Sequence, residues 1–272
     1  MKKHISYRSA ELLSVLNSRN QLYFTIEEAG QILVESEEPA VRKLLSSMTK
    51  RGLLLRIKDG LYHIIPYEKN IGEYYPNWHI VAEKLVQPEE YYIGYYSALD
   101  IHGVITQPSL VEQVVTKKQF LPGTRKIKNV RYQFITLSEE RFFGSSKIWI
   151  DDYNKVWCSD LEKTIIDCLY IPKYANGLTE IIKAVYRCRD KIDSEKMQKY
   201  LDIYGSEAVL KRLGFILDNL GILNSMAVYI NGRINKSYSL LDPSFAHRGK
   251  HNSRWKIIDN IGIEESMKSL ET

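Results

Sequence analysis

The sequence predicts an α+β protein in two parts, a small N-terminal domain over residues 1–70 and a larger mixed α+β domain over residues 71–272. Three observations support this prediction. The chain has 272 residues, and single hydrophobic cores rarely grow beyond about 250 residues. Three amphipathic helix patterns and a hairpin signal occupy the first 66 residues. In the remainder, a run of strand patterns precedes a run of helix patterns, which is typical of an α+β domain.

The composition is that of a folded globular chain. Hydrophobic residues make up 44% and charged residues 26%, close to the averages for globular domains, which excludes a disordered polymer. The sequence contains no apolar run of 18 residues and no signal-peptide pattern, so we expect a cytoplasmic protein that does not contact a membrane. The cysteines Cys158, Cys168 and Cys188 lack metal-ligand spacing, and we expect them to be small core residues.

The first 66 residues carry the pattern of three helices. Apolar residues recur at helical spacing over 9–16, and Asn20 is a plausible stop. Thr25 and Glu28 form a capping box, in which each side chain satisfies a backbone amide at a helix start. A third helix is expected to begin near Ser36 to Pro39, because acidic residues and proline favour the first helical turn.

A hairpin is predicted directly after the third helix. Asp59-Gly60 separates two β-rich runs, 53–58 and 61–65, and Asp-Gly in this position is a strong hairpin signal. Three helices followed by a hairpin is the order of a winged helix-turn-helix domain, whose third helix enters the major groove of DNA. The predicted DNA-binding residues on this helix and the hairpin are Arg42, Lys43, Ser46, Ser47, Lys50, Arg56 and Lys58.

The formal net charge of +5 is unevenly distributed along the chain. Residues 1–66 carry +3, residues 117–138 carry +6, residues 233–256 carry +5, and the remainder carries −9. Residues 117–138 and 233–256 are therefore predicted to form secondary basic patches. The alternatives for each patch are that it binds nucleic acid, that it binds an acidic partner, or that it is solvated surface without a partner. Their candidate residues are Lys117, Lys118, Arg125, Lys126, Lys128, Arg131, Arg248, Lys250 and Arg254. For Arg254, beside Trp255, a structural role in fixing the tail is also open.

The larger domain is expected to run from strands to helices. After a connector over 66–76, Asn77 caps a short helix, and strand patterns follow over 91–95, 110–115, 130–137, 147–150 and 155–157, with a short helix over 97–101. Ser159 and Glu162 form a second capping box. Helices are then expected over 178–189, 193–203 and 206–220, and a short strand over 237–241.

No catalytic motif is present in the sequence. Its acidic residues include none with a lysine two positions later, as the common metal-dependent nuclease core requires. Gly205-Ser206 precedes Asp218 at a nucleotidyltransferase-like interval, but Leu220 stands where the second carboxylate is needed. We therefore predict no catalytic residue, no metal and no cofactor. One alternative is a nucleic-acid-processing enzyme whose site is assembled without a linear motif, for example from Asp151, Asp152 and Glu162.

Several short motifs together resemble the AbiEi family, the antitoxins of type IV toxin–antitoxin systems. They are Asp59-Gly60-Leu61-Tyr62, Ser97-Ala98-Leu99 with His102-Gly103, the stretch from Ser159-Asp160-Leu161-Glu162-Lys163 to Ile166-Asp167, Leu241-Asp242-Pro243, and Arg254-Trp255. No single motif is specific for the family. Their combined order and spacing, across nearly the whole chain, are specific for it. Lys163 departs from the arginine that is common in the family and keeps the charge.

The resemblance implies a cytoplasmic autorepressor that binds inverted repeats in its own operator. It also implies that the C-terminal domain counters a cognate nucleotidyltransferase-like toxin, and that a stable complex with the toxin is not required. A further alternative is a transcriptional regulator whose C-terminal domain binds a ligand or a partner. The operator sequence and the oligomeric state stay open at this point.

Overall fold

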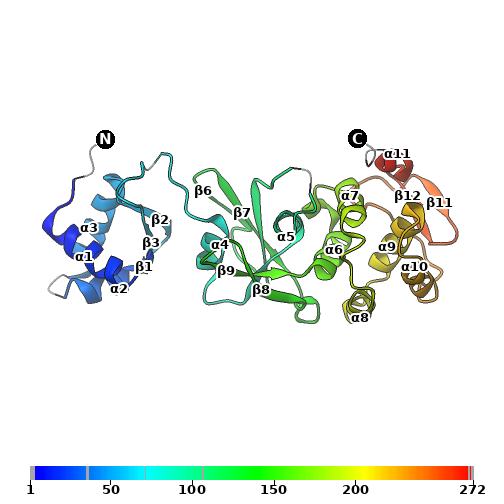
Figure 1. Ribbon diagram of the computed structural model, residues 1–272, viewed down its shortest axis with the longest axis horizontal. Helices are drawn as coiled ribbons and strands as arrows, with labels where there is room; N and C mark the ends of the chain where they lie inside the picture. Colours follow the sequence, from blue (N-terminus) through cyan, green and yellow to red (C-terminus); the bar gives the residue numbers. More distant parts are fainter. Residues whose placement is uncertain (1–3, 35–36, 71, 106, 269, 271–272) are drawn as a thin grey trace. The chain divides into compact units, whose positions relative to one another are not determined.

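The structure, a computed structural model, describes residues 4–34, 37–70, 72–105, 107–268 and 270. It divides the chain into two compact units, Met1–Gln87 and Pro88–Thr272 (Figure 1). The first unit extends beyond residue 70, because it includes helix α4 (Trp78–Val86), which the sequence analysis assigned to the larger domain. No helix within the described ranges is long and apolar enough to cross a membrane.

The first unit has the winged-helix order of elements. Its elements are α1 (Tyr7–Ser18), β1 (Tyr23–Thr25), α2 (Ile26–Ile32), α3 (Glu38–Lys50), β2 (Leu54–Lys58), β3 (Leu61–Ile64) and α4. The three strands form an antiparallel sheet in the order β1-β3-β2. The helices and the sheet enclose a core that includes Leu12, Phe24, Leu45 and Met48, all of which are fully buried.

Local sequence signals set the boundaries of this unit. The Thr25 side chain accepts from the Glu28 amide (3.2 Å), and the Glu28 carboxylate accepts from the Thr25 amide (2.6 Å), which confirms the predicted capping box. Pro39 lies in the first turn of α3 as expected, while the predicted start at Ser36 lies outside the described residues. Strand β1 was not predicted, because three residues are too few for an alternating pattern.

The second unit is built on a six-stranded mixed sheet. Its strands are β4 (Tyr91–Ile93), β5 (Val111–Thr116), β6 (Thr124–Ile127), β7 (Val130–Thr136), β8 (Ser145–Trp149) and β9 (Lys155–Ser159), in the order β6-β7-β5-β4-β9-β8. The pairs β5·β7 and β4·β9 are parallel, and the other pairs are antiparallel. Helix α5 (Tyr95–Ile101) lies between β4 and β5 in the sequence. The mixed sheet confirms the predicted α+β class, although β6 was not predicted.

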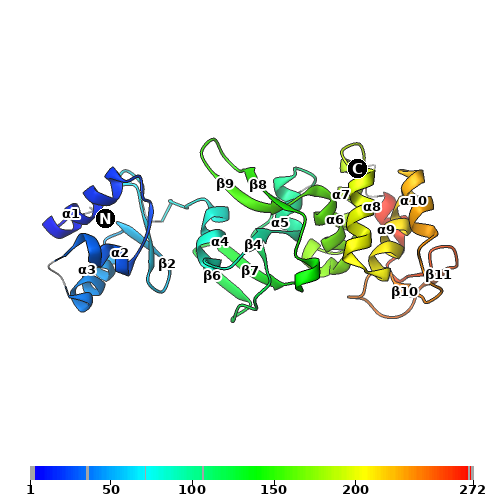
Figure 2. The same ribbon diagram turned by 90° about the horizontal axis from the view of Figure 1, so that it is seen from below.

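Helices dominate the rest of the second unit (Figures 1 and 2). They are α6 (Leu161–Tyr170), α7 (Leu178–Cys188), α8 (Ser194–Tyr204), α9 (Glu207–Leu220), α10 (Asn224–Asn231) and α11 (Ile263–Lys268). Short 3-10 turns cover Glu139–Arg141 and Pro172–Ala175. A small sheet, in the order β10-β12-β11, joins β10 (Ser239–Leu240), β11 (Lys250–Asn252) and β12 (Ile257–Asp259). Helices α10 and α11 and strands β11 and β12 were not predicted.

The start of α6 corrects the second capping-box prediction. The N-cap is Asp160, not Ser159, and its carboxylate accepts from the Lys163 amide at 3.0 Å. The Glu162 carboxylate does not reach back to the N-cap. It accepts instead from the Asp193 amide (2.9 Å) and pairs with Lys196 (2.9 Å), because the end of the α7–α8 connection packs against this turn.

A buried ionic network joins α6 to the sheet and to α8. The Lys163 ammonium lies 2.5 Å from Asp167 Oδ1, and both side chains are completely buried. Asp167 also accepts from the hydroxyls of Tyr92 (2.9 Å) and Tyr204 (3.1 Å). Burial raises the pKa of the Asp167 carboxyl and lowers the pKa of the Lys163 ammonium, because desolvation disfavours both charges. The surrounding hydrogen bonds and the mutual attraction oppose this effect.

We expect the first unit to lose stability in mild acid through His63. The side chain is 2% exposed, its Nε2 lies 2.8 Å from the Tyr74 hydroxyl, and burial lowers its pKa from 6.5 to about 4. The neutral form therefore stabilises the fold above pH 6.5, and this contribution of about 3 kcal/mol is lost as the pH falls from 6.5 to 4. Urea unfolding across this range should show a smaller pH dependence in His63→Phe. Identical pH dependence in the two proteins would contradict the assignment.

Candidate nucleic-acid interface

One face of α3 gathers five of the predicted DNA-binding residues. They are Arg42, Lys43, Ser46, Ser47 and Lys50, and all are exposed. Their spacing over two helical turns places them on one side of the helix, opposite the buried Val41, Leu45 and Met48. Two short hydroxyl side chains between three cations can approach base edges and phosphates closely. We call these five residues the α3 face.

Arg42 has an intrahelical partner. Its guanidinium lies 2.7 Å from the Glu38 carboxylate one turn earlier, and both side chains are exposed. An exposed pair of this kind contributes only a few tenths of a kcal/mol, roughly 0.3–0.5, in isolated helices. A phosphate can therefore replace Glu38 at little cost.

The structure separates the two hairpin cations that the sequence analysis grouped together. Arg56 is exposed and pairs with Asp59 at 2.5 Å. The Lys58 ammonium donates to the carbonyl oxygens of Leu85 (3.1 Å) and Gln87 (3.3 Å), at the end of α4. A cation is favourable there because the carbonyl groups of the last turn carry partial negative charge. Lys58 is thus held within the first unit, whereas Arg56 stays at the hairpin surface.

Arg51, which no sequence pattern singled out, connects the end of α3 to the start of α1. At the end of α3, its guanidinium donates to the His4 carbonyl (2.8 Å) and to the Ser9 hydroxyl (2.9 Å). These bonds connect the end of α3 to the start of α1 and so fix the orientation of the α3 face. The partners are more than 40 residues apart in the sequence, so no local pattern could reveal the contact.

Acidic residues from other segments neutralise part of the first secondary basic patch. The Lys117 ammonium pairs with Glu90 (2.5 Å) and Glu139 (2.8 Å), and Lys118 pairs with Glu89 (2.7 Å). The charge of +6 over residues 117–138 therefore overstates the local positive charge, because the compensating carboxylates lie outside that segment.

The other cations of this patch lie on β6 and β7. Arg125, Lys126 and Arg131 are exposed, and Lys126 lies directly opposite Arg131 in the antiparallel ladder. Lys128 is half-buried in the connection between the strands, and burial lowers its pKa. The structure thus brings Lys126 and Arg131 together and sets Lys117 and Lys118 among acids.

In the C-terminal patch, Arg254 has the structural role that the sequence analysis left open. Its guanidinium pairs with Asp218 at 2.7 Å, and the indole of Trp255 donates to the same carboxylate at 2.8 Å. Asp218, which the sequence analysis considered only as one carboxylate of an incomplete nucleotidyltransferase pattern, therefore anchors the tail to α9. Arg248 and Lys250 are exposed.

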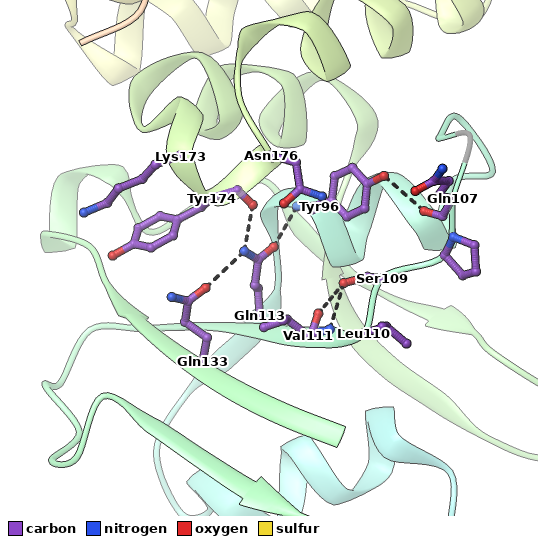
Figure 3. A pocket seen from close by; sticks show the side chains of 11 residues that line it. Tyr96, Gln107, Ser109, Leu110, Val111, Gln113, Gln133, Lys173, Tyr174 and Asn176 are labelled. Carbon is purple, nitrogen blue, oxygen red and sulfur yellow. Dashed lines mark hydrogen bonds between the residues drawn. The ribbon is translucent and has the colours of Figure 1, made fainter. Parts of the chain in front are cut away.

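A polar pocket of about 570 Å³ lies in the second unit (Figure 3). Gln113 organises it: the side-chain oxygen accepts from the Tyr96 amide (2.8 Å), and the side-chain nitrogen donates to the Tyr174 carbonyl (2.7 Å) and to Gln133 (3.2 Å). Lys173, Tyr174 and Gln133 present polar ends on the same side of the pocket in Figure 3. Donor groups of this kind suit a small ligand that carries carbonyl, carboxylate or phosphate oxygens. No local sequence pattern indicates this pocket, because its lining comes from segments far apart in the chain.

The residues suggested for an enzymatic alternative lie apart. Asp151 and Asp152 occupy the turn of the β8–β9 hairpin, whereas Glu162 follows its other end, at the start of α6. The paired strands between these two positions extend for roughly 13 Å. Asp151 also accepts from the amides of Tyr153 and Asn154, as a turn-stabilising residue does.

Comparisons with known proteins relate this chain to others through its fold. The sequence matches no protein-family model and no curated protein. The structure is similar to the crystal structure of the Rv2827c protein from Mycobacterium tuberculosis, with a TM-score of 0.77. The similarity covers 99% of this chain and 97% of that one, at 11% sequence identity. The two chains therefore share the complete α+β fold, including the winged N-terminal unit.

Proposed function

We propose that this chain is a DNA-binding autorepressor and antitoxin of the AbiEi type, which counters a nucleotidyltransferase-like toxin. The observation that carries the DNA-binding part is the α3 face, an exposed surface of cations and hydroxyls on the third helix of a winged unit. The order of family-like motifs supports the antitoxin part. We further propose that the chain has no enzymatic activity, in line with the missing second carboxylate at Leu220.

In the proposed mode of binding, α3 lies in the major groove and Arg56 contacts a flanking phosphate. Arg42 exchanges Glu38 for a backbone phosphate, which forms charge-assisted hydrogen bonds with the guanidinium in place of a weak surface pair. Lys58 supports the hairpin from behind through α4 and makes no contact with DNA. The hydrogen bond from Arg51 to Ser9 holds the end of α3 against the start of α1.

We expect Arg42→Ala/Lys50→Ala to weaken binding to the upstream operator roughly 10- to 100-fold, since each lost phosphate contact removes counterion release. The slope of log affinity against log salt should become shallower by about 2. Fluorescence anisotropy with operator DNA at several salt concentrations measures both quantities. The matched control is Arg19→Ala/Lys69→Ala, which removes the same charge from exposed positions of the first unit outside α3. Equal losses in the two variants would contradict a specific role for the α3 face.

The antitoxin part is tested by growth rescue. Expression of an adjacent nucleotidyltransferase-like gene should arrest growth, and co-expression of this chain from an unrelated promoter should restore it. Because neutralisation is assigned to the second unit, the Arg42→Ala/Lys50→Ala variant should rescue as well as the natural protein. Failure of the natural protein to rescue would remove the antitoxin assignment and leave DNA binding untouched.

The polar pocket favours a second candidate function, a transcriptional regulator that responds to a small ligand. Lys173, Gln133 and Tyr174 supply donors, and Gln113 holds the lining in place. Thermal-shift measurements with small carboxylates and phosphate esters distinguish this function. Stabilisation that is lost in Lys173→Ala, with a matching change in operator affinity, would favour the ligand-responsive regulator over the antitoxin.

A further inference from the structure

The β8–β9 hairpin carries a repeated pattern that the proposed function does not use. Each strand contains a lysine, an apolar residue and a tryptophan in succession, at 147–149 and at 155–157. In the antiparallel ladder, Lys147 lies opposite Trp157 and Trp149 lies opposite Lys155. Opposed residues, and residues two apart along a strand, project from the same face of a sheet. The four side chains therefore share one face, which we call the tryptophan–lysine platform.

The platform is exposed to an extent that is unusual for tryptophan. Trp149 is 62% exposed and Trp157 is 40% exposed, and Tyr153 in the adjoining turn is 87% exposed. β8 is also an edge strand of the six-stranded sheet. Large exposed aromatic groups at a sheet edge favour aggregation, and such groups gathered on one surface typically mark an interaction site.

The charges on the platform indicate what kind of partner it fits. The Lys155 ammonium lies 4.3 Å from the ring centre of Trp149, and that of Lys147 lies 5.8 Å from the ring centre of Trp157. The carboxylates of the hairpin, Asp151 and Asp152, lie in the turn beyond the ladder. A protein interface core is typically depleted of lysine, whereas aromatic rings alternating with cations are typical of surfaces that bind unpaired nucleotides.

We propose that the tryptophan–lysine platform binds single-stranded nucleic acid, with bases stacked on Trp149 and Trp157 and phosphates bound by Lys147 and Lys155. Diagonal neighbours in such a ladder lie roughly 7–8 Å apart, about twice the ~3.4 Å rise between stacked bases. Two unstacked bases of an extended strand can therefore each reach one indole. A duplex keeps its base faces covered, so this platform selects single strands.

Stacking of a base on an indole is more favourable than the contact between the indole and a lysine. An exposed cation–π contact contributes about 0.5–1 kcal/mol, whereas a base stacked on an aromatic side chain contributes about 1–3 kcal/mol. Displacing Lys155 from the ring of Trp149 by a base is therefore favourable in free energy. The released ammonium can then bind the phosphate of the incoming nucleotide. The platform thus provides both parts of the interaction in its unbound form.

The test uses the full chain with labelled 12-nucleotide oligouridylate, oligothymidylate and a 12-base-pair duplex. Trp149→Ala/Trp157→Ala should bind both single strands at least 10-fold more weakly and leave duplex binding unchanged. The matched control is Trp78→Ala, which removes a tryptophan that is 45% exposed in the first unit and should leave single-strand affinity unchanged. The Arg42→Ala/Lys50→Ala variant should weaken operator binding and leave single-strand affinity unchanged, so failure of either proposal is visible separately.

A second variant guards against misfolding. Lys147→Gln/Lys155→Gln keeps both indoles and should reduce the salt dependence of single-strand binding, with an unchanged circular dichroism spectrum. Tight binding to either oligonucleotide supports the proposal. Oligodeoxyuridylate, which differs from oligouridylate only in lacking the 2′-hydroxyl, then distinguishes RNA from DNA as the source. Unchanged single-strand affinity in the tryptophan variant would overturn the proposal. Sedimentation of the same variant gives a second check. If Trp149→Ala/Trp157→Ala abolishes self-association but keeps its affinity for the oligonucleotides, the platform is a protein interface and the proposal is overturned.

Discussion

Asp167→Ala is expected to destabilise the second unit by roughly 3–5 kcal/mol, because it leaves the completely buried Lys163 ammonium without its partner. Tyr92 and Tyr204 would also lose the acceptor of their buried hydroxyls. These contacts join α6 to β4 and to α8, so the loss affects the centre of the unit rather than one element. Urea unfolding followed by far-ultraviolet circular dichroism measures the change.

The double variant Lys163→Met/Asp167→Leu is the control for this interpretation. Replacing both charges by apolar groups of similar size removes the desolvation penalty together with the attraction. We therefore expect the double variant to be more stable than Asp167→Ala. A double variant that is as unstable as the sum of both single variants would show that the pair does not act as a unit.

Gly214→Ala is expected to destabilise the second unit by about 2–3 kcal/mol, despite the higher helix propensity of alanine. A Cβ atom at this position in α9 would lie 2.0 Å from Cζ3 and 2.4 Å from Cε3 of Trp255. The indole has little freedom to move away, because it is fully buried and its Nε1 is bonded to Asp218. Thermal unfolding should show a clear drop in the midpoint.

Gly30→Ala provides the matched control for this change. Gly30 also lies inside a helix, α2, and a Cβ atom there would meet nothing within 4 Å. This substitution should stabilise the first unit by up to about 1 kcal/mol through helix propensity alone. In a Trp255→Leu background, Gly214→Ala should cost less than it does in the natural protein, because the indole that the new Cβ atom would meet is gone. Equal effects at Gly30 and Gly214 would contradict the packing argument.

The elements that could be predicted are those with signals inside a few residues. The capping box of Thr25 and Glu28, the Asn77 cap of α4 and the Asp59-Gly60 turn appear in the structure where the sequence places them. Asp160 shows the limit of such signals. The sequence pattern indicates a capping box of Ser159 and Glu162, whereas in the structure Asp160 is the N-cap and Glu162 accepts from the Asp193 amide at the start of α8.

The residues of the candidate site divide in the same way. The exposed position of the five residues of the α3 face could be predicted, because helical periodicity alone separates them from the buried stripe. The partners of Lys58, Arg51 and Lys117 could not, because each lies in a segment remote in the sequence. The tryptophan–lysine platform had a usable signal in its repeated triplets. Its meaning depended on the register, which places both tryptophans on one exposed face.

The sequence by itself determined the α+β class, the winged order of the first unit and the cationic face of α3. These features follow from backbone hydrogen bonding and from the burial of periodic apolar side chains, which act over one or two turns. Only the tertiary structure decided which charges are neutralised, that Asp167 holds Lys163 inside the core, and that Asp218 anchors Trp255. Electrostatic and packing interactions act between atoms that are close in space, and chain folding sets those distances.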